Sequence, residues 1–398
     1  MIASTLLTPA SFNALPQLAR EISLLRERIL ANVVMMGEIP APTFGEQNRI
    51  TFLQDRFIEG GLHDVMVDDV GNGLARLPGS VGAKSILVFA HVDTPFPCTV
   101  DHTVHVTPEA ISGPGVGDNV LGLATVASLP FILERLGITL KHDFILMGDV
   151  RSLGRGNIAG MRTFLENNKR LLHGGICVEG VQLGRLSYAS PGMLRAEVRC
   201  STGGGDELWP TGLQPGAIGP LMTFIDGLMA LPELEQPGVS LILGSVSGGT
   251  AYNTTAAEAR LAFEVRGRDE GSVATIEQSI SALLDACCGE QGDQCSCSIA
   301  MDVLARRSSG GIDESHPIVS SAKAAMESLD IAPCITPTTG SASALIDAGI
   351  PCVVLGLTEG RAIHELHERI MIDPIFTGIA QLLSVMLAMD NDYGQSRD

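Results

Sequence analysis

Side chains that can bind metal ions stand where apolar runs of this sequence end. The run "SILVFAHVD" closes with His91 and Asp93, and Glu179 is next to last in the run "GGICVEG". Asp118 stands in the glycine-rich turn "SGPGVGDNVLGLA", and His364 follows the apolar run "PCVVLGL". Imidazole and carboxylate groups are ligands of zinc. The Asp93 carboxylate, two residues after His91, would suit fixing the imidazole tautomer through Nδ1.

Each of these signals has a simpler explanation when it is taken alone. A His-x-Asp pair is most often a surface turn or a satisfied core histidine, and an Asp-Asn pair before a helix is most often a cap. The histidines of "HELHE" are three positions apart, so this stretch is not the H-E-x-x-H zinc motif. The sequence also lacks the G-x-S-x-G and G-x-x-x-x-G-K-[ST] motifs. The prediction of a metal site therefore depends on the whole group.

An open α/β sheet would bring these residues together. Up to about residue 180, segments with helical periodicity alternate with apolar strand patterns, which favours a sheet with helices on both faces. Ligands bind at the carboxyl ends of strands in such sheets. We expect helices at about 14–34, 46–62, 119–137 and 156–172, and strands at 64–79 (two strands and a turn), 84–93, 142–150 and 174–180.

The pattern changes near residue 190. The segments up to residue 305 follow the order β-α-β-β-α-β, which is typical of a ferredoxin-like α+β unit, and helix–strand alternation then returns. We therefore predict a small domain at 190–305, inserted into a larger α/β domain formed by 1–189 and 306–398.

Composition narrows the classes of function. The net charge of −19 argues against nucleic-acid binding, which needs a basic surface. No window of 18 residues is continuously apolar, and the N-terminus lacks a basic segment followed by an apolar core. We expect neither a membrane span nor a signal peptide.

The nine cysteines fit a reducing cytoplasm better than a disulfide framework. The segment "CCGEQGDQCSC" is interpreted as a helix end, a loop and a strand start, with a metal site as the alternative.

Several stretches resemble the zinc-dependent aminoacylase and carboxypeptidase family of metallopeptidases, which includes acetylornithine deacetylase, succinyl-diaminopimelate desuccinylase and peptidase T. The resemblance covers nearly the whole chain in order. The stretches that carry it are "EIPAPTFGEQNR", "DDVGNGLARLPG", "AHVDTPFP", "GVGDNVLGLA", "GNIAGMR", "VSGGTAYNTTAAEARLAFEVRGRD", "AGIPCVVLGL" and "AIHELHE".

The resemblance implies a mixed-sheet catalytic domain with two metal positions. His91, Asp118 and Glu179 would bind one zinc ion, and Asp118 would bridge to a second ion held by His364. A cis peptide bond is expected between Asp118 and Asn119. Cobalt or manganese would also suit these ligands.

The resemblance also implies a substrate side and a partner. Asn253 would contact the substrate carboxylate, and Arg266 is a further candidate, with a structural arginine on a lid strand as the alternative. The inserted domain would serve as a lid and as the interface of a homodimer. The implied substrate is a short peptide or another small molecule.

The sequence departs from the family where a Glu-Glu pair is usual. In that family the first Glu is the general base and the second is a ligand of the second ion. Here those positions hold Ser152 and Leu153 or, in a shifted register, Val150 and Arg151, and the nearest acid is Asp149.

Two further departures concern the lid and a loop. A lid histidine of the family is replaced by Gly205 or Asp206, and Ser341 stands where an acid is usual. The sequence favours a metal-dependent hydrolase of an amide bond in a small peptide or N-acyl amino acid, with impaired or altered chemistry. The alternative is a non-catalytic ligand-binding protein on the same scaffold.

Overall fold

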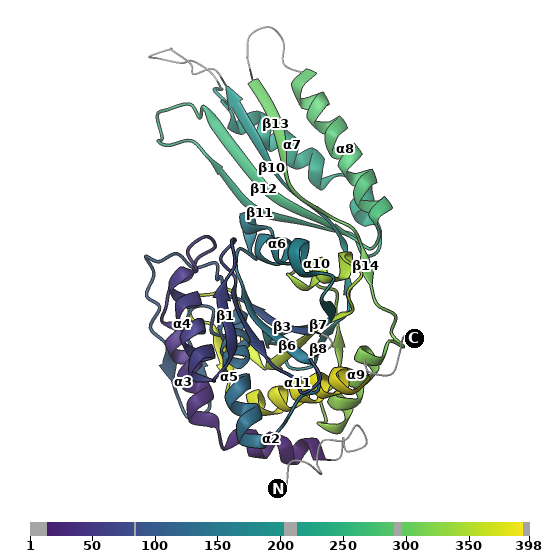
Figure 1. Ribbon diagram of the computed structural model, residues 1–398. Coiled ribbons are helices and arrows are strands. Elements are labelled where there is room, and N and C mark those ends of the chain that lie inside the picture. Colours follow the sequence, from purple (N-terminus) through teal and green to yellow (C-terminus); the bar gives the residue numbers. More distant parts are fainter. Residues whose placement is uncertain (1–13, 83–84, 203–212, 290–296, 393–398) are drawn as a thin grey trace. The chain divides into compact units, whose positions relative to one another are not determined.

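The computed structural model describes residues 14–82, 85–202, 213–289 and 297–392. Contacts divide the chain into two compact units, one formed by Met1–Ala189 with Gly311–Asp398 and the other by Ser190–Gly310 (Figure 1). Each unit is described separately below.

The first unit is built on an eight-stranded mixed sheet. Strand β3 lies between β6 and β7 and runs parallel to both, and β7 runs parallel to β16. The strands β1, β2 and β6 pair antiparallel at one edge. In spatial order the strands are β1 (His63–Val67), β2 (Gly73–Leu77), β6 (Asp143–Asp149), β3 (Ser85–His91), β7 (Leu172–Val181), β16 (Cys352–Thr358), β8 (Arg185–Ser187) and β15 (Cys334–Ile335).

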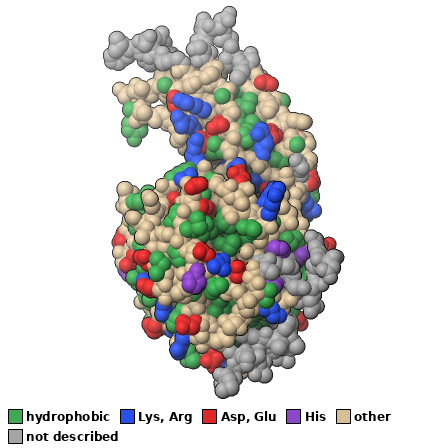
Figure 2. Space-filling view, viewed as in Figure 1, with side chains coloured by type: hydrophobic (Ala, Val, Ile, Leu, Met, Phe, Trp, Pro, Cys, Tyr) green, Lys and Arg blue, Asp and Glu red, His purple; other side chains and the backbone are tan. Residues whose placement is uncertain are grey.

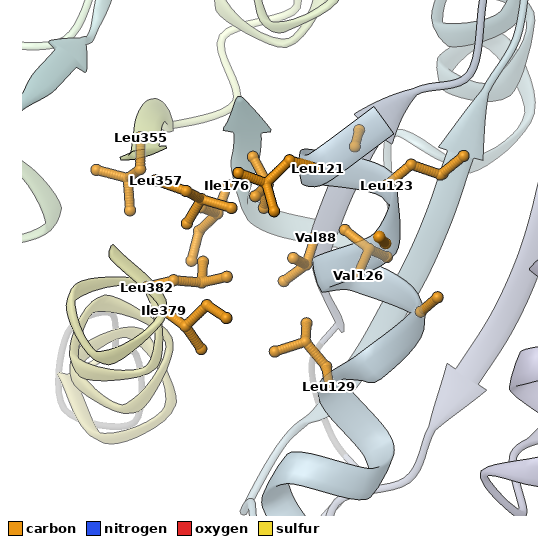
Figure 3. Close-up of a cluster of buried hydrophobic side chains, with 14 of the residues drawn as sticks. Val88, Leu121, Leu123, Val126, Leu129, Ile176, Leu355, Leu357, Ile379 and Leu382 are labelled. Atoms are coloured by element: carbon orange, nitrogen blue, oxygen red, sulfur yellow. The ribbon is translucent and has the colours of Figure 1, made fainter. Parts of the chain in front are cut away.

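Alternating side chains of the central strands fill two apolar layers. In β3, Val88 packs in the cluster that includes helices α5 and α11 (Figure 3), while Phe89 packs in the cluster that includes α6 and α10. Successive side chains of a strand point to opposite faces, so a strand covered on both faces is apolar throughout. The continuous apolar runs of the sequence are explained by this burial.

Helices cover both faces of the sheet, as predicted. The expected helix at 14–34 is divided in two, because Leu24 and Leu25 donate to carbonyls three residues back and tighten the chain into a turn. The helices of this unit are α2 (Leu15–Ser23), α3 (Arg26–Gly37), α4 (Gln47–Glu59), α5 (Leu121–Leu136), α6 (Ala159–Asn168), α9 (Pro317–Ser328), α10 (Ala342–Asp347) and α11 (Asp373–Asp392).

One helical segment among the described residues, Val116–Leu136, is long and apolar enough to cross a membrane. However, 89% of its most apolar window is buried inside the protein. Leu121, Val126 and Leu129 of this helix lie in the core cluster of Figure 3. Its apolar composition is therefore explained by packing against the sheet.

A small sheet, which the sequence did not predict, carries the segments around the candidate site. It pairs β17 (Gly360–Arg361), β18 (Arg369–Met371), β5 (Ala110–Ser112) and β4 (His105–Val106) in that order. These strands are too short to show a two-residue periodicity. Two further short strands, β9 (Ala189–Ser190) and β14 (Gly310–Gly311), pair with each other.

The second unit has the predicted order of elements. Its antiparallel sheet has the strand order β11-β12-β10-β13. Phe224 of one helix and Ile280 of the other are buried in its core. The elements are β10 (Gly192–Thr202), α7 (Ile218–Met229), β11 (Ser240–Gly248), β12 (Glu258–Gly267), α8 (Glu270–Gly289) and β13 (Cys297–Arg307). Figure 2 shows one face of the protein, on which Lys and Arg side chains are interspersed with acidic and apolar side chains.

Candidate metal centre

Three neighbouring strands carry a polar, titratable side chain at or near their carboxyl ends. His91 is the last residue of β3, Asp149 is the last residue of β6, and Glu179 lies near the end of β7. His91 and Asp149 are register partners in the parallel pair. Phe89 of β3 and Cys177 of β7 belong to the same apolar layer, so His91 and Glu179, each two residues further on, face the same side of the sheet.

Asp118 reaches this edge of the sheet on a short non-helical turn before α5. Its neighbour Asn119 is 1% exposed and bonds to β7 much as another strand would. Asn119 Nδ2 donates to the Val178 carbonyl at 2.8 Å, and the Gly180 N–H donates to Asn119 Oδ1 at 2.8 Å. These bonds flank Glu179 and hold Asp118 beside it. The expected cis peptide bond between Asp118 and Asn119 is present.

The predicted ligands of the first ion lie together. One ligand atom from each of His91, Asp118 and Glu179 can be chosen so that all three lie within 4.8 Å of one another. His91 Nε2 is 2.9 Å from Asp118 Oδ1. Among the described residues, this is the one group of three or more His, Cys, Asp or Glu side chains with such spacing.

His364 approaches the same cluster from the loop between β17 and β18. Its Nε2 is 2.7 Å from Asp118 Oδ2, so the two oxygens of Asp118 face two different imidazoles. The His364 side chain is 65% exposed, whereas that of His91 is 9% exposed. The Asp118 carboxylate thus lies between a buried histidine and an exposed one.

Glu368 joins the backbones that carry Asp118 and His364. Its Oε1 accepts the N–H groups of Gly117 at 2.6 Å and Asp118 at 2.8 Å, and its Oε2 accepts the His364 N–H at 3.1 Å. The residue is fully buried, and burial raises the pKa of Glu368 to about 7. Sequence analysis missed this residue, although it lies within the "AIHELHE" stretch.

The charges of the cluster favour a cation. Burial opposes protonation of His91, but the hydrogen bond and charge of Asp118 outweigh burial and raise the pKa of His91 to about 10. Burial also opposes the charge on Asp118, but hydrogen bonds from His364 and His91 hold the pKa of this carboxyl well below its usual range. Burial raises the pKa of Glu179. Positive charge is thus stabilised between these carboxylates, and a divalent ion can supply it in place of protons.

The donor set fits a divalent metal ion at the first position. One imidazole and two carboxylates match the His and Asp/Glu ligands of catalytic zinc sites, which keep one position open. His364 and the second oxygen of Asp118 offer two ligands for another ion. No further described His, Cys, Asp or Glu completes a second three-ligand group.

Asp93 holds the histidine in a different way from the one predicted. His91 Nδ1 is 2.9 Å from the Asp93 backbone carbonyl and 3.7 Å from the nearer carboxylate oxygen. The carbonyl is therefore the group that fixes the tautomer. The carboxylate instead accepts the N–H groups of Ser152 at 3.1 Å and Leu153 at 2.9 Å, and the Thr43 hydroxyl at 2.7 Å. Asp93 thus anchors the loop after β6, where the resemblance leads us to expect a Glu pair.

That loop presents hydroxyl groups to a buried acid. Asp149 Oδ2 accepts the hydroxyl groups of Ser152 at 2.6 Å and Ser341 at 2.5 Å. Asp149 Oδ1 is buried without a hydrogen-bond partner among the described residues, and burial raises the pKa of Asp149. Val150 is buried in the apolar core. No carboxylate occupies either register expected for the Glu pair.

The two substrate-side candidates belong to the second unit. Asn253 is exposed in the turn between β11 and β12. Arg266 lies in β12, where its Nε donates to Glu264 Oε1 at 2.6 Å. Arg195 also bonds Glu264, so Arg266 takes part in a structural ion pair. The expected lid-histidine position, Gly205 or Asp206, lies outside the described residues.

Comparisons with known proteins agree with this fold. The chain is 24% identical over 376 residues to peptidase T of Vibrio cholerae serotype O1, an alignment covering 84% of this chain and 88% of the relative. It is 22% identical over 383 residues to peptidase T of Bacillus velezensis, covering 83% and 88%. No family model matches the chain.

Solved structures show the same architecture. The di-peptidase Dug1p from Saccharomyces cerevisiae superposes with a TM-score of 0.79 at 12% identity, covering 96% of this chain and 99% of that one. A tripeptidase from Staphylococcus aureus gives 0.71 at 20%, covering 91% and 98%. A dinuclear metal-binding peptidase from Bacillus subtilis gives 0.63 at 15%, covering 92% and 98%. The chain is thus similar in sequence to peptidase T and shares its fold with these solved peptidase structures.

Proposed function

We propose that this protein is a metal-dependent hydrolase of an amide bond in a small peptide or an N-acyl amino acid. The observation that carries the proposal is the convergence of His91, Asp118 and Glu179, whose ligand atoms lie within 4.8 Å of one another at the carboxyl ends of parallel strands. The peptidase names of its relatives support the substrate class.

His91, Asp118 and Glu179 would hold one zinc ion, and cobalt or manganese also suits their donors. A bound ion of this kind polarises a carbonyl group and lowers the pKa of water. His364 would provide a second position with Asp118, and two protein ligands would hold an ion there more weakly than three. Asp93 would keep His91 in one tautomer through its backbone carbonyl and hold the loop after β6 through its carboxylate.

The chemistry would be slowed because the loop after β6 offers no glutamate. General bases typically contribute about 10²- to 10⁴-fold to a rate. The nearest acid, Asp149, is fully buried and already accepts two serine hydroxyls. This arrangement supports a structural role for Asp149 better than a role as substitute base.

The second unit would cover the substrate. We assign it as a lid and dimerisation domain, with Asn253 as the contact of the substrate carboxylate and Arg266 as a weaker candidate beside Glu264. The partners would be a short-peptide or other small-molecule substrate and a second copy of the chain. A cytoplasmic location agrees with the expected reduced state of the nine cysteines.

A substrate panel tests the activity. Purified protein would be incubated with zinc, cobalt or manganese and assayed on dipeptides, tripeptides and N-acyl amino acids. We expect slow, metal-restored release of free amine that His91→Ala abolishes and that His105→Ala, an exposed histidine on β4, leaves unchanged. No detectable hydrolysis of any substrate in the panel, with any of the three metals, would contradict the proposal.

A non-catalytic binding protein is the second candidate, and the missing Glu pair favours it. The double variant Ser152→Glu with Leu153→Glu tests it, with Ser152→Gln and Leu153→Gln as a control of similar volume. Activity in the Glu variant alone would show that the chain kept a substrate pocket and lost the catalytic groups. Measurable activity in the parent, equal to that of the Glu variant, would argue against this candidate.

A further inference from the structure

Two cysteines of the second unit lie next to each other outside the candidate metal centre. Cys200 belongs to β10 and Cys297 begins β13, and their Sγ atoms are 3.1 Å apart. The sulfur atoms of a disulfide bond are about 2.05 Å apart, so these thiols are about 1 Å from bonding distance.

The strand register explains this approach. Cys200 is opposite Ile299 and Cys297 is opposite Thr202, so the two cysteines are diagonal neighbours on adjacent antiparallel strands. Diagonal neighbours have Cα atoms about 7–8 Å apart, somewhat more than most disulfides allow. The Sγ separation shows that both side chains already point toward each other, so closing the bond requires only a small movement of the strand ends.

The two thiols differ in accessibility. Cys200 is fully buried beneath α7 and α8, whereas Cys297 is half-buried at the start of its strand. An accessible cysteine next to a second cysteine is the usual arrangement in reversible thiol oxidation, because the second thiol resolves the first oxidation product. Cys177 and Cys352, which are both buried in strands of the central sheet, lack this asymmetry.

We propose that Cys200 and Cys297 form a site of reversible oxidation by a hydroperoxide. The Cys297 sulfur attacks the peroxide oxygen, the O–O bond breaks, and Cys297 sulfenic acid and water are formed when hydrogen peroxide is the oxidant. The Cys200 sulfur then attacks the Cys297 sulfur, the S–O bond breaks, and a second water leaves. The pair loses two electrons and two protons, and the peroxide is reduced.

The resulting bond would join the ends of β10 and β13, whose cysteines are 97 positions apart in the chain. Closing so long a loop restricts the unfolded chain. The oxidised protein is therefore expected to unfold at a higher temperature than the reduced protein, and a dithiol reductant should reverse the shift.

Peptide mapping of the full-length protein tests the proposal. The reduced protein would be treated with hydrogen peroxide, alkylated and digested, and the masses of its peptides would be measured. We expect a peptide that joins Cys200 to Cys297 and is lighter than the sum of its parts by two hydrogen atoms. Recovery of both cysteines as alkylated thiols, or pairing of Cys297 with another cysteine such as Cys287, would overturn the proposal.

Two variants separate the two chemical steps, and a third is the control. Cys200→Ser should leave Cys297 as a sulfenic acid that dimedone captures, and Cys297→Ser should leave Cys200 as an unmodified thiol. Cys334→Ser removes an exposed cysteine of the first unit and should leave the cross-link unchanged. Oxidation of Cys200 in the Cys297→Ser variant would contradict the proposed order of the steps.

Discussion

Glu368 accepts the backbone N–H of Asp118 at 2.8 Å, although the two residues are 250 positions apart in the sequence. The same carboxylate accepts the His364 N–H, so one buried acid aligns two of the proposed ligand positions. Substitution of a group that orients metal ligands in this way typically weakens metal affinity about 10- to 100-fold.

Glu368→Gln should therefore weaken metal binding without removing a ligand. The glutamine amide has one accepting oxygen, and its NH₂ group cannot accept the N–H that Glu368 Oε2 now receives. We expect a loss of about 10-fold or more in affinity for zinc or cobalt, measured by competition with a chelator. Glu365→Gln, an exposed change on the same loop, is the control. Equal affinity of both variants would rule out the aligning role.

Asn119→Ala should destabilise the first unit and loosen Asp118. The change removes two buried hydrogen bonds and leaves the Val178 carbonyl and the Gly180 N–H without partners. Leaving a buried backbone group unsatisfied costs about 1–3 kcal/mol. We expect the free energy of unfolding in urea to fall by about 2–5 kcal/mol in total. A loss under about 1 kcal/mol would show that water or another group replaces the amide.

Asp93→Asn should affect the loop after β6 more than the histidine. The backbone carbonyl that contacts His91 Nδ1 remains, while one of the carboxylate oxygens that receive N–H groups is replaced by a donor. We expect a loss of about 1–3 kcal/mol in the free energy of unfolding, with a smaller loss of metal affinity than in His91→Ala. Metal loss as complete as that of His91→Ala would indicate that the carboxylate itself is essential for binding.

The sequence was sufficient to name the proposed ligands but not the groups that hold them in place. His91, Asp118 and Glu179 follow apolar runs or a glycine-rich turn, which are local signals. Glu368 and Asn119 act through hydrogen bonds to segments far away in the chain, and no local pattern reports such contacts. The carboxylate of Asp93 also binds a distant loop, so Asp93 contacts His91 Nδ1 through its backbone carbonyl instead.

Local sequence patterns likewise predict only part of the fold. The α/β sheet was predictable because its central strands β3, β7 and β16 are buried on both faces, and the six-element order of the second unit was predictable from longer periodic segments. The two-residue strands β4 and β17 each pair with the next strand in the chain, and they are too short to show a periodicity. The break between α2 and α3 at Leu24 has no glycine or proline to mark it.

Asp149 should make stability depend on pH. Burial raises the pKa of Asp149 in the folded protein above its ordinary value of 3.8, so the folded chain keeps a proton that the unfolded chain releases. The stability that this proton contributes is present at acidic pH and is lost as the pH rises. Asn at this position does not titrate, so the stability of Asp149→Asn relative to the parent should increase from acidic to neutral pH. Urea unfolding across that range would show a constant or falling difference if this account is wrong.

Metal content per chain tests the central claim most directly. Protein purified without chelator would be analysed for bound elements, alongside Glu179→Gln and His105→Ala. We expect about one equivalent of zinc or a similar divalent ion in the parent and in His105→Ala, and little in Glu179→Gln, because the proposed site would offer three protein ligands. No bound metal in the parent, even after incubation with excess zinc, cobalt or manganese, would contradict the account.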